Sequence, residues 1–479
     1  KAGMDMECQF RKCFNEELLE WFKSGREDME ILDRAVLRIL EAKFRMGLFE
    51  YPFADNKEEV YQLYEKKKNQ EISLQSARES MVLLKNDGTL PVDGKIKKIA
   101  LIGCHGSTAR AYFGGYTHFS MAEGFLVARS SMAGLVGDEK KMNDDVEKIP
   151  GTNIQKGKPE FEALLKKQKP GIKSLYEQMK EMMPDKEITY SFGYPFAGNE
   201  ETYHEEALEA AKEADLVILT LGGKHGTGSA SSMGEGIDGT DINLPPCQEN
   251  FIKKLAILEK PAVGIHFNGR PISSDAADQY LNAIIEAWNP AEMGSQAIVE
   301  VLLGQYNPGG KLPVSVAYAS GQIPVYYNHP FGSSFHQGES IGFANYVDMP
   351  HTPRYCFGHG LSYTEFGYED LQVGRKAVLP EEQVKISVKV RNSGSRTGDE
   401  VVQLYVTDRY ASLTRPNMEL AGFKRVTLKP GEEKKLVFTM QVSQFAFLDK
   451  KQRWLVEEGD MDVMVGSSSQ DIRLRDSFH

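Results

Sequence analysis

The chain has 479 residues, of which 41% are hydrophobic and 26% charged, and its formal net charge is -11. Typical domain sizes predict about two to four folding units for this length. No apolar run approaches the roughly twenty residues of a membrane helix, so we expect no membrane span. The negative net charge repels phosphate backbones, and we therefore expect no nucleic-acid partner.

The cysteines are few, scattered and odd in number, which argues against a disulfide framework and gives no zinc-ligand spacing. They are Cys8, Cys13, Cys104, Cys247 and Cys356. This usage favours a reducing compartment such as the cytoplasm. The first residues, KAGMDMECQF, contain no signal peptide. An export signal upstream of this sequence would escape that test, so the localisation stays open.

Helical periodicity dominates the first part of the chain. Apolar residues at helical spacing predict two helices within residues 15–50, and a third, charged stretch runs from about residue 57 to 84. No strand is expected between them. Amphipathic helices without partners cannot bury their apolar stripes, so a self-contained domain seldom begins in this way. We therefore expect a further segment upstream of these helices.

Short apolar strands alternate with helices in the next part of the chain. Strands are expected at residues 99–103, 215–221, 261–267 and 283–288, and helices at 160–167, 171–183, 205–214, 248–258 and 295–303. This alternation predicts an α/β sandwich with a mostly parallel sheet. A ligand of such a sheet is expected beyond the carboxyl ends of the strands.

The pattern changes again after residue 307, where a long Gly/Pro-rich and aromatic passage predicts a connecting loop. Alternation of period two then begins at residue 384. Strands are expected at residues 384–390, 401–407, 423–428, 435–440 and 462–466. Short strands separated by turns predict a C-terminal β-sandwich of the immunoglobulin or fibronectin III type.

The most suggestive stretch for chemistry is the long glycine-rich loop GGKHGTGSASSMGEGIDGTDINLPP at residues 222–246. It follows a predicted parallel strand, where sites are commonly built. Glu235 lies between Gly234 and Gly236 and is the carboxyl we would choose as an acid for glycoside cleavage. On spacing alone, however, a solvated surface role is favoured for any single loop carboxylate. Asp238 shares the loop, and Asp241 is expected to form a turn or cap.

Three further residues near this loop are candidates for substrate binding. Tyr116, in FGGYTH at residues 113–118, could stack on a sugar ring or could equally be a packed tyrosine with its hydroxyl at the surface. Lys224 and His225 could bind substrate hydroxyls. A lone Lys-His pair is a weak signal, however, and solvent exposure is favoured for both.

Other catalytic motifs have little support. LIGCHG at residues 101–106 lacks the full glycine series of a dinucleotide site, and GGKHGTGS places its lysine too early for a phosphate-binding loop. A G-x-S-x-G nucleophile elbow is absent. No cluster of residues with metal-ligand spacing is seen, so we expect neither a metal nor a cofactor.

Several long motifs, in one order, resemble family 3 glycoside hydrolases, the group that contains β-glucosidases and β-xylosidases. They are AGMDME at residues 2–7, AVLRILEAKFRMGLFE at 35–50, ESMVLLKNDGTLPV at 79–92, FNGRPI at 267–272, AWNPAEMGSQAIVEVLLGQYNPGGKLPVS at 287–315 and FGHGLSYTEF at 357–366. The resemblance spans essentially the whole chain and implies an oligosaccharide or another β-glycoside as substrate.

The resemblance implies a (β/α)8 barrel followed by an α/β sandwich and a fibronectin III-like domain. On that basis residues 1–74 are expected to be the end of the barrel and a linker, 75–330 the α/β sandwich, 331–365 a connecting loop and 366–479 the fibronectin III-like domain. The aromatic-rich loop at 329–356, with Phe331, Phe335, Phe343 and Tyr346, could rim the site, meet a partner or pack underneath, and a homo-oligomer is possible.

The resemblance also implies roles for individual residues. Glu235, in GEGID before INLPP, matches the family's general acid/base, and Tyr116 matches an aromatic, often Trp, that flanks the sugar. The nucleophilic Asp of the family lies in a Ser-Asp-Trp type motif that this sequence lacks. We therefore expect an exo-acting retaining β-glucosidase whose nucleophile comes from a barrel segment outside this sequence, so that this chain alone is inactive. The alternatives are a β-xylosidase or a non-catalytic carbohydrate-binding remnant.

Overall fold

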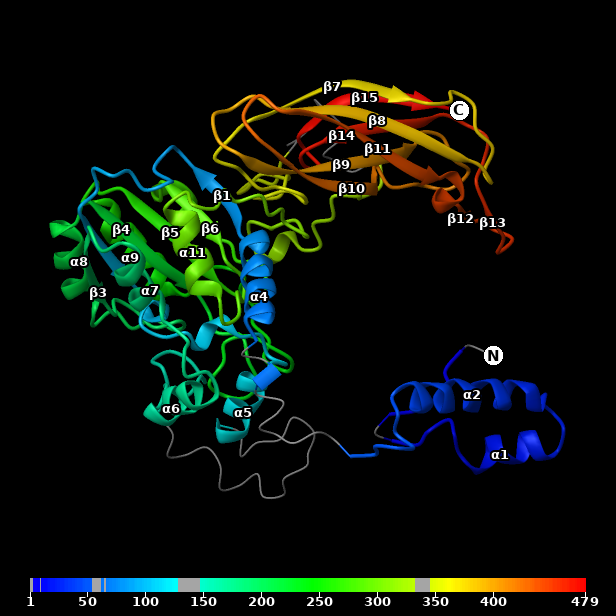
Figure 1. The fold of residues 1–479 in the computed structure, drawn as a ribbon, viewed down its shortest axis with the longest axis horizontal. Coiled ribbons are helices and arrows are strands. Elements are labelled where there is room, and N and C mark those ends of the chain that lie inside the picture. The colour runs from blue at the N-terminus through cyan, green and yellow to red at the C-terminus, as the bar shows by residue number, and fades with distance from the viewer. Residues whose placement is uncertain (1–2, 9, 54–61, 64–65, 128–146, 332–344) are drawn as a thin grey trace. The chain divides into compact units, whose positions relative to one another are not determined.

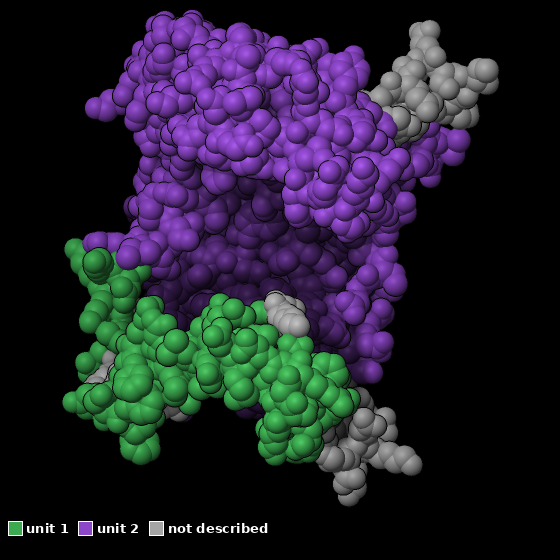
Figure 2. Space-filling view, turned by 90° about the vertical axis from the view of Figure 1, so that its right-hand side faces the viewer, with its two compact units in different colours: residues 1–70 green, residues 71–479 purple. Residues whose placement is uncertain are grey.

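The computed structural model describes residues 3–8, 10–53, 62–63, 66–127, 147–331 and 345–479. These residues fall into two compact units, residues 1–70 and 71–479 (Figure 2). Among the described helices, none combines the length and the apolar character that crossing a membrane requires. All five cysteines are free thiols.

The first unit contains the two helices predicted there, α1 Glu16–Lys23 and α2 Met29–Arg45. The Asn15 side chain caps α1 by accepting a hydrogen bond from the Leu18 backbone N. The Asp28 side chain caps α2 by accepting one from the Glu30 backbone N. Neither helix buries a single residue. Their apolar side chains therefore lie at the surface of this unit.

The expectation of one helix up to residue 84 is wrong at its C-terminal end, and part of it, residues 57–61 and 64–65, lies outside the described residues. Helix α4 spans Lys67–Ser80 and is followed at once by strand β1, Val82–Asn86. Apolar residues of VLLKN pair antiparallel with strand β6, so Val82 lies opposite Glu286. A short apolar run of this kind has no decisive local period, and the pairing partner determines its structure.

The second unit begins with the α/β part, whose sheet has the strand order β1-β6-β5-β4-β2-β3. Every neighbouring pair is parallel except β1 with β6. The predicted α/β fold with a mostly parallel sheet is thus confirmed. The remaining strands are β2 Lys98–Ile102, β3 Glu187–Ser191, β4 Leu216–Gly222, β5 Ala262–Phe267 and β6 Ala283–Glu286.

Helices cover both faces of this sheet (Figure 1). Alternate residues of β2 face opposite sides, so Leu101 packs with α7 and α11 while Ile102 packs with α8 and α9. Strand β4, LVILTLG, is buried along its whole length, as expected for a central parallel strand. The helices are α5 His118–Val127, α6 Pro159–Gln168, α7 Leu175–Met182, α8 His204–Glu213, α9 Pro246–Ala256, α10 Asp275–Tyr280 and α11 Gly294–Leu302.

The order of the strands produces a switch point between β2 and β4. The chain adds β3 on one side of β2 and then crosses to add β4, β5 and β6 on the other side. Crossover segments leaving β2 and β4 therefore diverge to opposite faces of the sheet, and a crevice opens beyond the carboxyl ends of the two strands. Doubly wound sheets bind their ligands in this crevice.

The C-terminal part is a β-sandwich of two antiparallel sheets, ordered β10-β9-β14-β15 and β11-β8-β7, with a short β12-β13 hairpin. The predicted β-sandwich is confirmed. Its core consists of inward-facing residues such as Val388, Leu404 and Val463. The strands are β7 Phe366–Val373, β8 Gln383–Asn392, β9 Gly398–Asp408, β10 Glu419–Leu428, β11 Glu433–Gln441, β12 Phe447–Leu448, β13 Trp454–Leu455, β14 Met461–Gly466 and β15 Ile472–Phe478.

Residues of the long connecting passage join the α/β part to the sandwich. Lys311 lies 3.6 Å from the buried Glu400 carboxylate of β9, and the Gln403 side chain donates to the Gly358 carbonyl at 3.1 Å. Of the aromatic residues for which a site rim, a partner contact and packing were all left open, Phe331 and Tyr346 are exposed, whereas Phe335 and Phe343 lie outside the described residues.

Candidate active site

The glycine-rich loop leaves the sheet where β4 ends, and buried side chains hold that end in place. The Gln248 amide accepts from Gly222 N at 2.8 Å and donates to Gly222 O at 2.9 Å. Nε2 of His105 lies 2.9 Å from Gly223 O, and because a carbonyl can only accept, this nitrogen carries the proton. Burial lowers the pKa of His105 to about 4, so the ring is neutral near pH 7.

The loop then folds back on itself. Lys224 O accepts from Ser232 N at 2.9 Å, and Gly226 N donates to Met233 O at 3.0 Å, so residues 224–226 run beside 232–233. The guanidinium of Arg270 donates to Ser232 O at 2.9 Å from the following strand connection. The base of the loop is therefore fixed by main-chain bonds and by several side-chain bonds, among them those of Arg270 and Ser232.

Glu235 lies at the tip of a tight turn on this base. Ile237 N donates to Gly234 O at 3.1 Å, which makes Glu235 and Gly236 the two central residues of the turn. Gly236 has φ +70°, a conformation that favours glycine. Gly234 has φ +149°, and a Cβ there would lie 2.0 Å from Gly226 O. The backbone thus requires glycine at position 234 and favours it at position 236, and the Glu235 side chain is exposed.

The other acidic residues of the loop differ from Glu235. Asp241 Oδ1 accepts from Asn243 N at 3.0 Å and from the Asn243 side chain at 2.7 Å, which confirms the turn role expected for it. Asp238 is exposed. Within the part of the chain that the structure describes, no group of three His, Cys, Asp or Glu side chains could hold a metal ion.

The segment that carries Tyr116 packs against the base of the Glu235 loop. His225 Nδ1 lies 3.3 Å from Gly115 N and 3.1 Å from Asn289 Oδ1. In the tautomer without a proton on Nδ1, this nitrogen accepts a hydrogen bond from Gly115 N. In the tautomer with a proton on Nδ1, it donates one to Asn289 Oδ1. A Cβ on Gly115 would lie 3.4 Å from Gly226 O. The structure therefore brings the Tyr116 segment, His225 and the Glu235 turn together, and it leaves the Tyr116 side chain 70% exposed.

The expectation that Lys224 is solvent-exposed is wrong. It is 2% exposed, and its ammonium donates to Glu123 Oε2 in α5. His225, for which exposure was also favoured, is half-buried. Burial lowers the pKa of Lys224, and the nearby Arg110 lowers it further, while Glu123 opposes both effects. The carboxylate that pairs with Lys224 belongs to Glu123, about a hundred residues earlier in the chain, so the loop sequence gives no sign of it.

Asn289 is a positioning residue that the motifs did not single out. Its Oδ1 faces His225, and its Nδ2 donates to Ala111 O at 3.2 Å, so it links three separate segments. Its neighbours Trp288 and Ala291 have φ +56° and +59°, which is strained for residues other than glycine. The only sequence signal for this geometry is the motif AWNPAEMG itself.

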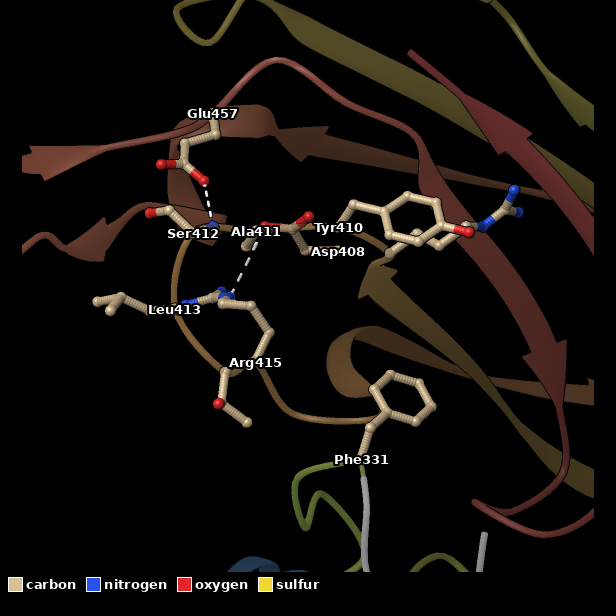
Figure 3. A pocket seen from close by; sticks show the side chains of 10 residues that line it. Phe331, Asp408, Tyr410, Ala411, Ser412, Leu413, Arg415 and Glu457 are labelled. Carbon is tan, nitrogen blue, oxygen red and sulfur yellow. Dashed lines mark hydrogen bonds and ion pairs between the residues drawn. The ribbon is translucent and has the colours of Figure 1, made fainter. Parts of the chain in front are cut away.

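A hollow of about 380 Å³ lies on the C-terminal β-sandwich, away from the Glu235 loop, beside Asp408 and Arg415 (Figure 3). Its charged groups already interact with the protein. Glu457 accepts from Ser412 N at 2.6 Å, and Arg415 Nε lies 3.8 Å from Asp408 Oδ2. This hollow offers no free carboxyl on a positioned turn, so the Glu235 loop remains the candidate for hydrolytic chemistry.

Comparison with known proteins identifies the family. The model of the glycosyl hydrolase family 3 C-terminal domain matches residues 81–363, more than half of the chain, and that of the fibronectin type III-like domain matches residues 400–469. The chain belongs to glycosyl hydrolase family 3.

Relatives in this family include enzymes with two named activities. The chain is 32% identical to the periplasmic beta-glucosidase of Salmonella typhimurium, over 99% of this chain and 58% of that protein. It is also 32% identical to a beta-xylosidase of Formosa agariphila, over 98% of this chain and 59% of that protein. The beta-glucosidase of Listeria innocua in complex with glucose aligns with a TM-score of 0.74 and 27% identity, over 96% of this chain and 56% of that one. The chain thus spans little more than half the length of these relatives.

Proposed function

We propose that this chain forms part of an exo-acting retaining β-glycosidase, most simply a β-glucosidase, in which Glu235 is the general acid/base. The observation that carries the proposal is the exposed Glu235 carboxyl on a turn between two glycines of positive φ, of which Gly234 leaves no room for a Cβ. The turn stands at the carboxyl edge of a parallel sheet, on a loop whose base is clamped. Such a carboxyl can approach a substrate without breaking any bond within the described residues.

Retaining hydrolysis needs two carboxyl groups about 5–5.5 Å apart. Glu235 would protonate the glycosidic oxygen as the bond breaks and would then accept a proton from the water that releases the sugar. The second carboxyl, an Asp that attacks the anomeric carbon, would come from a barrel segment outside residues 1–479. The packing of two domains would then set the distance between the carboxyls.

The exposed apolar surface of the first unit favours the proposal that a barrel segment packs against it. Helices α1 and α2 bury no residue, although both are strongly amphipathic. Exposed apolar side chains of this kind are stabilised when another element covers them. Those that a barrel would cover include Leu19, Trp21, Val36, Leu37, Leu40 and Phe44.

Tyr116 and His225 would complete the site around Glu235. The exposed ring of Tyr116 could stack on a sugar, because its segment packs on the loop base. His225 would hold that segment at a fixed distance from the turn through its contacts with Gly115 and Asn289.

The test compares Glu235→Gln with Asp238→Asn in an assembly of this chain with a barrel polypeptide. Aryl β-glucosides should be cleaved by the unsubstituted assembly, and Glu235→Gln should lower kcat by about 10²–10⁴-fold. The matched amide variant Asp238→Asn, on the same loop, should retain kcat. Turnover by residues 1–479 alone that Glu235→Gln abolishes would contradict the need for a barrel. Sugar binding without hydrolysis by any assembly would instead support a non-catalytic remnant.

A β-xylosidase is the second candidate, because the relative from Formosa agariphila carries that name at the same 32% identity as the beta-glucosidase. The two sugars differ by one hydroxymethyl group. Comparing kcat/KM for matched aryl β-glucosides and β-xylosides in the same assembly distinguishes the two activities.

A further inference from the structure

A cavity of about 420 Å³ lies at the switch point of the sheet, beyond the carboxyl ends of β2 and β4. Cys104 and His105 follow β2, Phe196 follows β3, and Lys224 follows β4, so the ends of three parallel strands contribute to one wall. This volume suits a ligand the size of a monosaccharide. Glu235 is not among the lining residues.

Two buried cations form part of the wall, and they share one carboxylate. Arg110 is 8% exposed and Lys224 2%. Arg110 Nε donates to Glu123 Oε1 at 2.7 Å, its Nη2 lies 2.6 Å from the same oxygen, and Lys224 Nζ donates to Glu123 Oε2. Two positive charges and one negative charge leave this buried cluster with a net charge of +1. This excess positive charge has no further buried counter-charge within the cluster, although the partly buried Glu162, Glu200 and Lys156 bring the formal charge of the whole wall to zero.

The cluster also has more donors than acceptors. An ammonium and a guanidinium carry three and five N–H donors, respectively. Among the described residues, Glu123 is the only hydrogen-bond acceptor for either group. One face of the guanidinium is covered by the Phe161 ring at 4.8 Å. The unused N–H groups therefore need acceptors that a ligand in the cavity could supply.

The rest of the wall differs from a simple anion site. Phe192, Phe196 and Tyr203 provide aromatic surface, and Ser107 and Thr108 provide hydroxyls. Two further carboxylates, Glu162 and Glu200, and the cation Lys156 also line the cavity. Carboxylates and hydroxyls accept hydrogen bonds from a polyol, and aromatic rings pack against its C–H faces. Such a wall suits a sugar that carries its negative charge at one end.

We propose that this cavity binds a monosaccharide carrying one oxyanion, either a carboxylate or a phosphate, whose oxygens contact Arg110 and Lys224. The ring would lie against the aromatic wall, and its hydroxyls would reach the carboxylates. The site is separate from Glu235 and does not depend on the proposed hydrolysis. An anion there would also favour the charged form of Lys224, whose pKa burial and Arg110 lower.

The test is titration calorimetry on residues 1–479 with glucuronate, glucose 6-phosphate, glucose and inorganic phosphate. At least one anionic sugar should bind at least tenfold more tightly than glucose and than inorganic phosphate. Glucuronate and glucose 6-phosphate distinguish a carboxylate from a phosphate site. Equal affinity for glucose would remove the role of the oxyanion, and equal affinity for inorganic phosphate would remove that of the sugar. Absence of binding by both anionic sugars would overturn the proposal.

Two variants with different physical effects locate the site. Lys224→Met removes a cation and should weaken binding of the preferred sugar more than tenfold. Gly157→Val adds volume without charge, because a Cβ on Gly157 would lie 2.9 Å from Arg110 Nη1, and it should weaken binding similarly. The exposed Lys212 of α8 provides the matched control, Lys212→Met, which should bind normally. Unchanged affinity in Gly157→Val, with the fold intact by circular dichroism, would place the ligand elsewhere.

Discussion

Glu235 and Glu123 lie in neighbouring parts of one domain, yet their surroundings differ in every respect. Glu235 is exposed on a glycine turn, whereas Glu123 is buried between Arg110 and Lys224. A buried carboxylate that joins two cations stabilises the fold, and its loss leaves their charges uncompensated. An exposed carboxylate contributes little to stability and is free to act on a substrate. Glu235 is therefore suited to chemistry, whereas Glu123 is suited to stabilising the fold.

Exchanging each carboxylate for its amide should produce opposite defects. Glu235→Gln should lower kcat of the barrel-containing assembly by about 10²–10⁴-fold and leave stability within about 0.5 kcal/mol. Glu123→Gln should lower the free energy of unfolding by about 3–5 kcal/mol, because it leaves two buried cations. Urea denaturation of both variants measures the change in the free energy of unfolding. A stability loss in Glu235→Gln as large as that in Glu123→Gln would remove the distinction.

The neutral His105 beneath the loop should make stability depend on pH. Its pKa is about 4 in the folded state and 6.5 in the unfolded chain, so the unfolded state binds more protons between these values. Stability should therefore be complete above pH 6.5 and fall by about 3 kcal/mol as the pH drops to 4.

His105→Gln checks this dependence, because its amide can still donate to Gly223 O but does not titrate. The difference in unfolding free energy between the unsubstituted chain and this variant should shrink or reverse as the pH falls from 6.5 to 4. Parallel pH profiles for the two proteins would show that His105 contributes none of the dependence.

The two glycines beside Glu235 should respond differently to alanine. At Gly234 a Cβ would collide with Gly226 O, so Gly234→Ala should displace the turn and lower kcat by about 10²-fold. At Gly236 a Cβ meets nothing within 4 Å, so Gly236→Ala should cost about 1 kcal/mol of stability for its positive φ and little activity. Similar kcat values for both variants would mean that the position of the turn does not matter.

Local pattern was sufficient for much of the fold. The continuous apolar run of β4 and the alternation of β8 predicted their strands, and Asp241 forms the turn expected of it. Strand β1 was missed because VLLKN acquires its structure by pairing with β6. The burial of Lys224 was missed because Glu123 and Arg110 approach it from distant segments. Errors thus occur where a contact between remote residues outweighs the local pattern.

The candidate site shows the same division. The Gly-Glu-Gly sequence indicates a turn, but the need for Gly234 arises from Gly226 O, and the link from His225 to Asn289 crosses 64 residues. Neither has a local signal. The family motifs pointed to Glu235 and Tyr116, whereas the groups that hold them, such as Gln248 and Arg270, emerge only from the structure.

The most direct test of the central claim is the dependence of kcat/KM on the leaving group, measured in the barrel-containing assembly with and without Glu235→Gln. If Glu235 protonates the glycosidic oxygen, the variant should lose most activity on glycosides of weakly acidic phenols and little on those of strongly acidic phenols, which need no proton. An equal loss for every leaving group would contradict the assignment of Glu235 as the general acid.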